Sequence, residues 1–215
     1  MKYSGEYLRE ISFPLGGIGT GCIGIAGNGG LVDFEIFNRP NKGSRINGTT
    51  FFAITAKYPD GKTDARIICG DAIKDLSGRY NGVRGFGHGP SADTMCGLPH
   101  FSNVSFDGRF PTAELVFGDE TFPGTVIMTA WSPFIPLDAE NSGIPAACFD
   151  ISLEERRDDI EYSVFFSVKN PFGRTRNTDV STDAFTAVKM YPDDKSQSDK
   201  EYGDMPSFFS CAASR

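Results

Sequence analysis

The middle of the chain, residues 132–154, constrains the fold more than any other stretch. Pro133, Pro136 and Pro145 each fix the backbone and remove an amide donor, so the first half of this segment fits neither a helix nor a central strand. Apolar and polar residues then alternate over residues 148–153, which is typical of a half-buried strand. We therefore expect a rigid crossing that leads from one β-sheet to another.

Turn-forming and aromatic residues are frequent in the rest of the chain. The 215 residues include 25 Gly, 13 Pro and 19 Phe, which is typical of many short strands joined by turns. Runs of alternating polarity predict strands at about 18–26, 31–37, 51–58, 63–69, 101–106, 112–117, 125–131, 146–153, 161–168, 184–190 and 207–215. These patterns predict a single all-β domain over residues 1–215, a two-sheet antiparallel β-sandwich with long Gly-rich loops.

Turn signals predict how neighbouring strands are joined. Asn28-Gly29 predicts a type I′ hairpin turn, and the sequence Pro-Asp-Gly-Lys at residues 59–62 predicts a second hairpin. Asp107-Gly108 predicts a turn after the strand at 101–106. Residues 70–99 and 170–177 show no regular period, so we expect both stretches to be loops.

A Gly-x-Gly-x-x-Gly pattern occupies residues 19–24 and matches a dinucleotide-binding fingerprint. That fingerprint needs a following helix, whereas residues 27–30 read Gly-Asn-Gly-Gly and cannot continue one. We expect instead a glycine-studded strand pressed against another backbone. On this interpretation Gly19→Val would overpack the site at a cost of roughly 1–3 kcal/mol.

Two further groups of residues have both a chemical and a plainer interpretation. Asp33 and Glu35 stand two apart on a predicted strand, so both carboxylates should point to one face and Val32 to the other. They favour a solvated face or an interface over a glycosidic acid/base pair, because a substrate would lie over them and not between them. His88 and His100 show no established zinc spacing, so no metal or cofactor is expected.

Charge and cysteine content exclude several classes of partner. The net charge of −7 argues against binding to nucleic acid, which needs clustered cationic side chains. No run is long enough to cross a membrane, and the N-terminus has no apolar signal segment. The five cysteines are odd in number and lack Cys-x-x-Cys spacing, so we expect reduced thiols and a cytoplasmic protein.

Four sequence blocks, taken in order, are recognisable. They are residues 13–21 (FPLGGIGTG), 33–43 (DFEIFNRPNKG), 97–101 (GLPHF) and 133–145 (PFIPLDAENSGIP). Together they resemble the N-terminal domain of glycoside hydrolase family 116, the non-lysosomal glucosylceramidase and bacterial β-glucosidase type. The likeness covers about residues 11–171.

This resemblance implies a β-sandwich followed by an (α/α)6 helical domain, which holds the Glu nucleophile and Asp acid/base of a retaining glucosidase. The chain stops before such a domain, so no catalytic residue is carried over, and we expect an inactive fragment or shortened product that lacks the last sandwich strands. Its expected role is to support the missing catalytic domain. The domain-interface candidates are Asp33, Glu35, Asn38, Arg39, His100, Asp138 and Asn141.

Two alternatives stay open at this point. A freestanding carbohydrate-binding sandwich could capture a β-glucoside or glycan by stacking Tyr80, Phe86 or Trp131 on sugar rings, although a lone Trp beside Pro133 is more typical of a core residue. A sandwich without its last strands could also self-associate through unpaired strand edges.

Overall fold

The structure is a computed structural model that describes residues 1–37, 50–71, 97–172, 175–192 and 208–212. The chain divides into two compact units, Met1–Ser167 and Val168–Arg215, which are described separately. Both are built from antiparallel strands, which confirms the predicted all-β class. Within the described residues, no helix is long and apolar enough to span a membrane.

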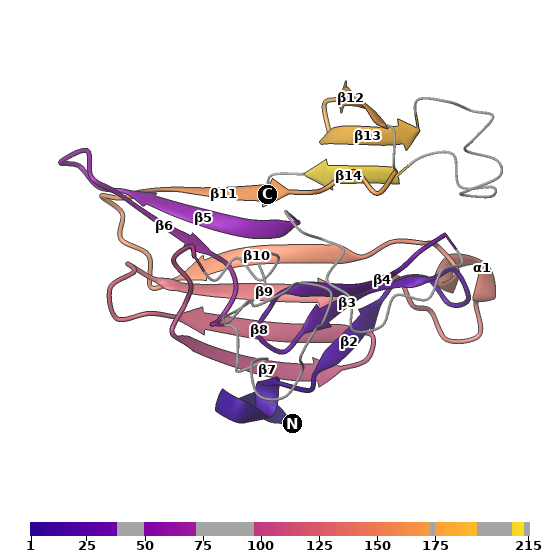
Figure 1. The fold of residues 1–215 in the computed structure, drawn as a ribbon, viewed down its shortest axis with the longest axis horizontal. Coiled ribbons are helices and arrows are strands. Elements are labelled where there is room, and N and C mark those ends of the chain that lie inside the picture. Colours follow the sequence, from indigo (N-terminus) through magenta and orange to yellow (C-terminus); the bar gives the residue numbers. More distant parts are fainter. Residues whose placement is uncertain (38–49, 72–96, 173–174, 193–207, 213–215) are drawn as a thin grey trace, which may run out of the picture. The chain divides into compact units, whose positions relative to one another are not determined.

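A five-stranded sheet is the largest element of the first unit (Figure 1). Its strands, in spatial order, are β1 (Lys2–Ser4), β7 (Asn103–Arg109), β8 (Thr112–Gly118), β9 (Thr125–Trp131) and β10 (Cys148–Glu154). Every neighbouring pair is antiparallel. A 3-10 turn, Gly5–Leu8, follows β1.

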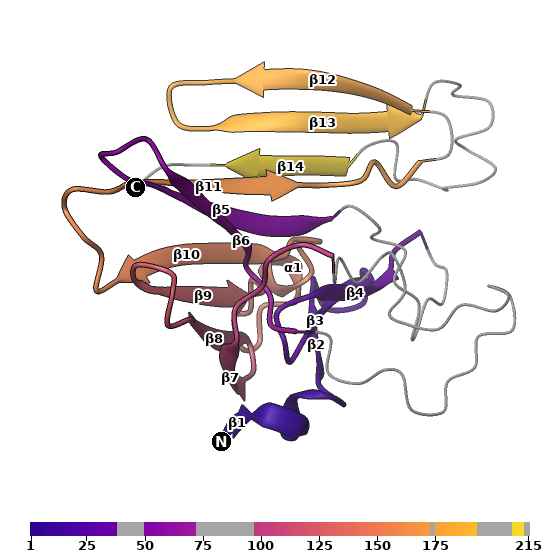
Figure 2. The ribbon, with the colours of Figure 1, turned by 60° about the vertical axis from the view of Figure 1, so that its left-hand side comes forward.

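Two three-stranded sheets complete the first unit (Figures 1 and 2). One has the order β2 (Ser12–Leu15), β3 (Cys22–Ala26), β4 (Leu31–Glu35), and the other has the order β11 (Glu161–Ser167), β5 (Phe51–Lys57), β6 (Thr63–Ile67). Leu15, Ile25, Ile54, Leu115 and Met128 come from all three sheets and are at most 1% exposed within one apolar cluster. The sheets therefore form a sandwich around a shared core.

The second unit has one sheet with the order β12 (Thr175–Ser181), β13 (Thr186–Pro192), β14 (Phe208–Ala212). The predicted strand at 184–190 is confirmed by β13, and the one at 207–215 is confirmed over residues 208–212, the part of it that the structure describes. The loop expected at 170–177 is wrong at its end, because β12 begins at residue 175 and pairs with β13 along its whole length.

The proline-rich segment does not cross between sheets, so that prediction is wrong. β9 and β10 are adjacent in the five-stranded sheet, with Trp131 opposite Cys148, and the segment connects them as a long loop. A four-residue helix, α1 (Ala139–Ser142), also forms inside it. Pro136 and Pro145 lie outside these four residues, so the amides that proline lacks are not needed for the hydrogen bonds of the helix. Asp138 caps its first turn.

Several predicted hairpins are found, with differences in the turns. β5 and β6 form the expected hairpin, and β3 and β4 are joined at Asn28-Gly29. In the Asn28-Gly29 turn only Gly29 has a left-handed backbone (φ +92°), so the predicted type I′ turn is wrong. The turn is a three-residue loop that ends at Gly29. Gly108 pairs with Ala113 inside β7, and the chain reverses two residues later at Phe110-Pro111, so the turn expected at Asp107-Gly108 is wrong.

Candidate functional site at a three-loop junction

Three of the four sequence blocks meet at one place in the first unit. We call this place the three-loop junction; it consists of residues 16–21, the end of β4 at Glu35, and residues 132–145. The Ile18 amide donates to the Ser142 carbonyl oxygen at 2.8 Å, and the Gly16 amide donates to Ser132 Oγ at 2.8 Å. Ser132 is 3% exposed, so this second bond is shielded from water.

Glycine is required where these backbones touch. A Cβ atom on Gly17 would lie 2.5 Å from the carbonyl oxygens of both Gly143 and Ile144. A Cβ atom on Gly21, whose φ is +90°, would lie 2.6 Å from the carbonyl oxygen of Glu35. Backbone atoms cannot be moved as cheaply as a flexible side chain, so any side chain at either position would destabilise the junction.

The 132–145 loop is braced from inside. Ser142 Oγ accepts the Ile135 amide and donates to the Ile135 carbonyl oxygen, both at 2.9 Å. Asp138 accepts the Asn141 backbone amide at 3.0 Å and the Asn141 side-chain amide at 2.5 Å. These bonds, the backbone one first, hold the pKa of the Asp138 carboxyl below its ordinary value. Leu137 is left-handed (φ +69°) and fully exposed at the tip.

The carboxylates on β4 each have a structural partner. Asp33 is 6% exposed, and Ser12 Oγ on β2 donates to its Oδ2 at 2.7 Å. Glu35 Oε2 lies 3.6 Å from the Cys22 sulfur on β3 and accepts its weak thiol hydrogen bond. Both groups therefore tie β4 to the rest of its sheet.

A β-bulge changes the predicted facing of β4. Val32 pairs with Gly24 and Glu35 pairs with Cys22, so three steps on β4 match two steps on β3. Val32 and Glu35 consequently share a face, and the prediction that they oppose each other is wrong. Asp33 occupies the irregular position with φ +47°, a backbone angle that Asp tolerates better than most residues.

Among the residues that the structure describes, no contact brings the other predicted interface residue, His100, to the junction. His100 is half-buried and precedes Phe101, which is fully buried in the core. Asn38 and Arg39 lie outside the described residues, as do Tyr80, Phe86 and His88. Among the described residues, no group of three or more His, Cys, Asp and Glu side chains could hold a metal ion.

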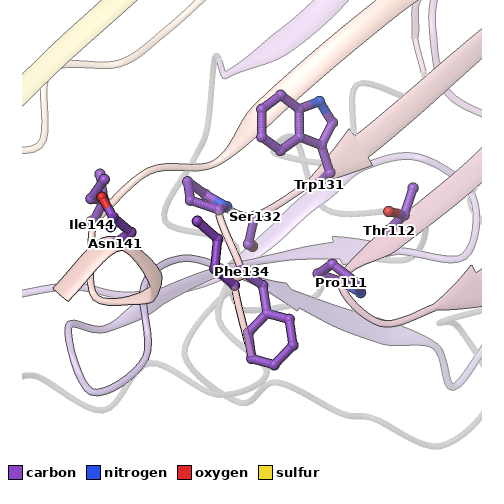
Figure 3. A pocket seen from close by; sticks show the side chains of 9 residues that line it. Pro111, Thr112, Trp131, Ser132, Phe134, Asn141 and Ile144 are labelled. Carbon is purple, nitrogen blue, oxygen red and sulfur yellow. The ribbon is translucent and has the colours of Figure 1, made fainter. Parts of the chain in front are cut away.

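A pocket of about 440 Å³ opens beside the junction, and sequence reasoning missed it (Figure 3). It is lined by Pro111, Thr112, Trp131, Ser132, Pro133, Phe134, Ile135, Asn141 and Ile144. Trp131 is half-buried and its indole N–H donates to Asp150 Oδ2 at 2.8 Å, so the expectation of a core tryptophan is wrong. The available signal was the run of Pro133, Phe134 and Pro136 directly after the single Trp, which the sequence had already suggested as a sugar-stacking residue.

Comparisons with known proteins identify the family of the sequence. The family model described as "beta-glucosidase 2, glycosyl-hydrolase family 116 N-term" matches residues 12–207. This match covers all four blocks, the first unit from residue 12 onward and the second unit as far as residue 207. No curated protein matches the chain.

Proposed function

Because the chain belongs to the family of glycoside hydrolase 116 N-terminal domains, we propose that it is the non-catalytic β-sandwich of a β-glucosidase-like hydrolase. Its role is to support and position an (α/α)6 catalytic domain of the same enzyme. The substrate class of the whole enzyme is β-glucosides, with glucosylceramide as one candidate, and its compartment is the cytoplasm. The family match supports the glycosidase context, and the odd number of cysteines without Cys-x-x-Cys spacing supports the compartment.

The observation that carries this proposal is the state of the acidic residues. Retaining and inverting glycosidases need two carboxyl groups that flank one bond of the substrate. Asp33 is buried against Ser12, and Asp138 is bonded twice by Asn141. Both carboxylates are used to hold strands and loops together, so we assign them a structural role and not acid/base chemistry.

The three-loop junction supplies the surface for the helical domain. Ile18 is 59% exposed and Leu137 is fully exposed, although both lie on loops held rigid by backbone hydrogen bonds. Exposed apolar side chains on rigid loops are typical of protein interaction surfaces. Asp138 and Asn141 lie on the same loop, and we propose that they shape this surface. Asp33 and Glu35 support it from β4.

An assay and a binding experiment test the proposal. The chain alone is expected to hydrolyse an aryl β-glucoside no faster than buffer, and to co-purify with the helical domain of a family 116 enzyme when both are expressed. Leu137→Asp should weaken that complex, whereas Ser152→Asp on the exposed face of β10 should not. Turnover by the chain alone that disappears in Asp33→Asn would overturn the non-catalytic assignment.

A further inference from the structure

We propose that the pocket lined by Trp131 binds a pyranoside, with the sugar ring stacked on the indole. This inference goes beyond the supporting role and does not depend on it. It rests on three features of the pocket: an indole held in place, rigid apolar walls, and hydrogen-bonding groups on two opposite sides. Pockets that bind small molecules combine apolar lining with a few polar groups in this way.

The indole is fixed before any ligand arrives. Trp131 ends β9 and lies between Thr112 on β8 and Cys148 on β10 in the sheet register. Its N–H donates to Asp150 Oδ2 at 2.8 Å, which satisfies the only polar group of the ring and sets its orientation. A ring fixed in advance loses little conformational entropy on binding, so it serves well as a stacking platform.

The apolar walls are rigid for separate reasons. Pro111 and Pro133 have fixed backbone angles, and the Ser132 amide donates to the Pro111 carbonyl oxygen at 3.2 Å. The Phe134 ring packs edge-on against Phe110, with ring centres 5.0 Å apart and an interplanar angle of 69°. The walls are therefore formed in the free protein, and they suit the C–H faces of a sugar ring.

Polar groups lie on opposite sides of the space in Figure 3, Thr112 on the strand side and Asn141 on the loop side. Asn141 donates its side-chain amide to Asp138, and among the described residues none donates to its side-chain oxygen Oδ1. Thr112 supplies a hydroxyl. A pyranoside has apolar faces and hydroxyl groups around its edge, which matches apolar walls with hydrogen-bonding groups at two sides. The volume of about 440 Å³ is in the usual range for small-molecule pockets, roughly 300–1,000 Å³.

The single tryptophan of the chain makes the test direct. Tryptophan fluorescence of the full chain reports only on Trp131, so we would titrate methyl β-glucopyranoside and cellobiose and follow intensity and emission maximum. A saturable change with either sugar is expected, with mannitol, an open-chain polyol, giving none. If hexanol gives a saturable change and neither sugar does, the pocket takes an apolar group and the proposal is overturned. If none of these probes changes the tryptophan fluorescence, the proposal is overturned as well.

Calorimetry on variants separates this pocket from sugar binding elsewhere. Trp131→Ala should weaken sugar binding about tenfold or more, while Trp131→Phe should retain part of it because a ring remains. Leu137→Ala is the matched control, since that side chain is fully exposed on the same loop and does not line the pocket. If the Ala variant fails to fold, Asn141→Ala replaces it. Unchanged affinity in the folded pocket variants would overturn the proposal.

Discussion

The backbone of Gly17 lies against the carbonyl group of Gly143, 126 residues further along the chain, at a distance that leaves no room for a methyl group. A Cβ atom on Gly17 would be 2.5 Å from the Gly143 oxygen. The contact joins the first and last of the four sequence blocks, so Gly17 is needed here for the close packing of two backbones. The three-loop junction depends on this contact.

Gly17→Ala should lower the free energy of unfolding by roughly 1–3 kcal/mol, because the added methyl group must displace backbone and not a flexible side chain. Urea unfolding followed by circular dichroism measures the difference. Gly118→Ala is the control, because a Cβ atom there has no neighbour within 4 Å. Equal midpoints for the two variants would contradict the proposed role of Gly17.

Gly19 should respond to substitution for a different reason. A Cβ atom on Gly19 would meet nothing within 4 Å, so the predicted overpacking is wrong at this position. Its φ of +76° is left-handed, a conformation that costs other L-residues roughly 1–2 kcal/mol. Gly19→Val should therefore destabilise the protein more than Gly19→Asn, because Asn tolerates left-handed backbone. Equal melting temperatures for the two variants would exclude backbone strain as the cause.

Ser12→Ala should lower the free energy of unfolding by roughly 1–3 kcal/mol, the usual cost when a buried polar group loses a hydrogen-bond partner. The change removes the hydroxyl that donates to Asp33 Oδ2 at 2.7 Å, and Asp33 is 94% shielded from solvent. Thermal unfolding measures the loss. The double variant Asp33→Asn/Ser12→Ala should lose less free energy of unfolding than the two single variants lose together, because the two side chains interact directly.

The strand pattern could be predicted from sequence because alternation of polarity over β5, β8, β9 and β10 is regular and local. The way in which these strands are connected could not be predicted from the sequence. Pro133, Pro136 and Pro145 exclude regular structure in a segment, but nothing in the segment specifies whether its flanking strands are neighbours. Register depends on long-range pairing, which the sequence of one loop does not contain.

Of the predicted interface residues, Asp138 and Asn141 lie at the three-loop junction, and their role at an interface stays a prediction. Their local arrangement follows from turn-forming chemistry, because Asp138 caps the short helix that Asn141 belongs to. The bulge at Asp33 was missed, since it arises from pairing between β3 and β4. The pocket was missed because it is assembled from the turn before β8, the end of β9 and the following loop.

Asp119 should make stability depend on pH in acid. The Thr121 hydroxyl and amide, and then Ser102, donate to its carboxylate and lower its pKa from 3.8 to about 2. A folded-state pKa below the unfolded one stabilises the protein above pH 3.8, and this contribution is lost as the pH falls toward 2. Because the group is partly exposed, the contribution is roughly 1 kcal/mol after screening.

The measurement for Asp119 is the stability difference between the wild type and Asp119→Asn at several pH values. The difference should be largest at neutral pH and should shrink between about pH 4 and pH 2. Glu120→Gln removes the same charge from the exposed neighbouring residue, and it serves as the control. A difference that stays constant across this range would show that the hydrogen bonds to Asp119 do not stabilise its charged form.

Ser142 tests whether the 132–145 loop is held from inside. Its hydroxyl accepts from the Ile135 amide and donates to the Ile135 carbonyl oxygen, and the residue is 1% exposed. Ser142→Ala removes both bonds and leaves two backbone groups without this partner, so it should lower the free energy of unfolding by roughly 1–3 kcal/mol.

Since Ile135 also lines the pocket, amide hydrogen exchange in Ser142→Ala should speed up across the loop, and Trp131 emission should shift to longer wavelength as water enters. Ser152→Ala, on the exposed face of β10, should change neither quantity. Unaltered exchange in Ser142→Ala would show that the Ser142 hydroxyl does not hold the loop, and that its prolines and the bonds between Asp138 and Asn141 are sufficient.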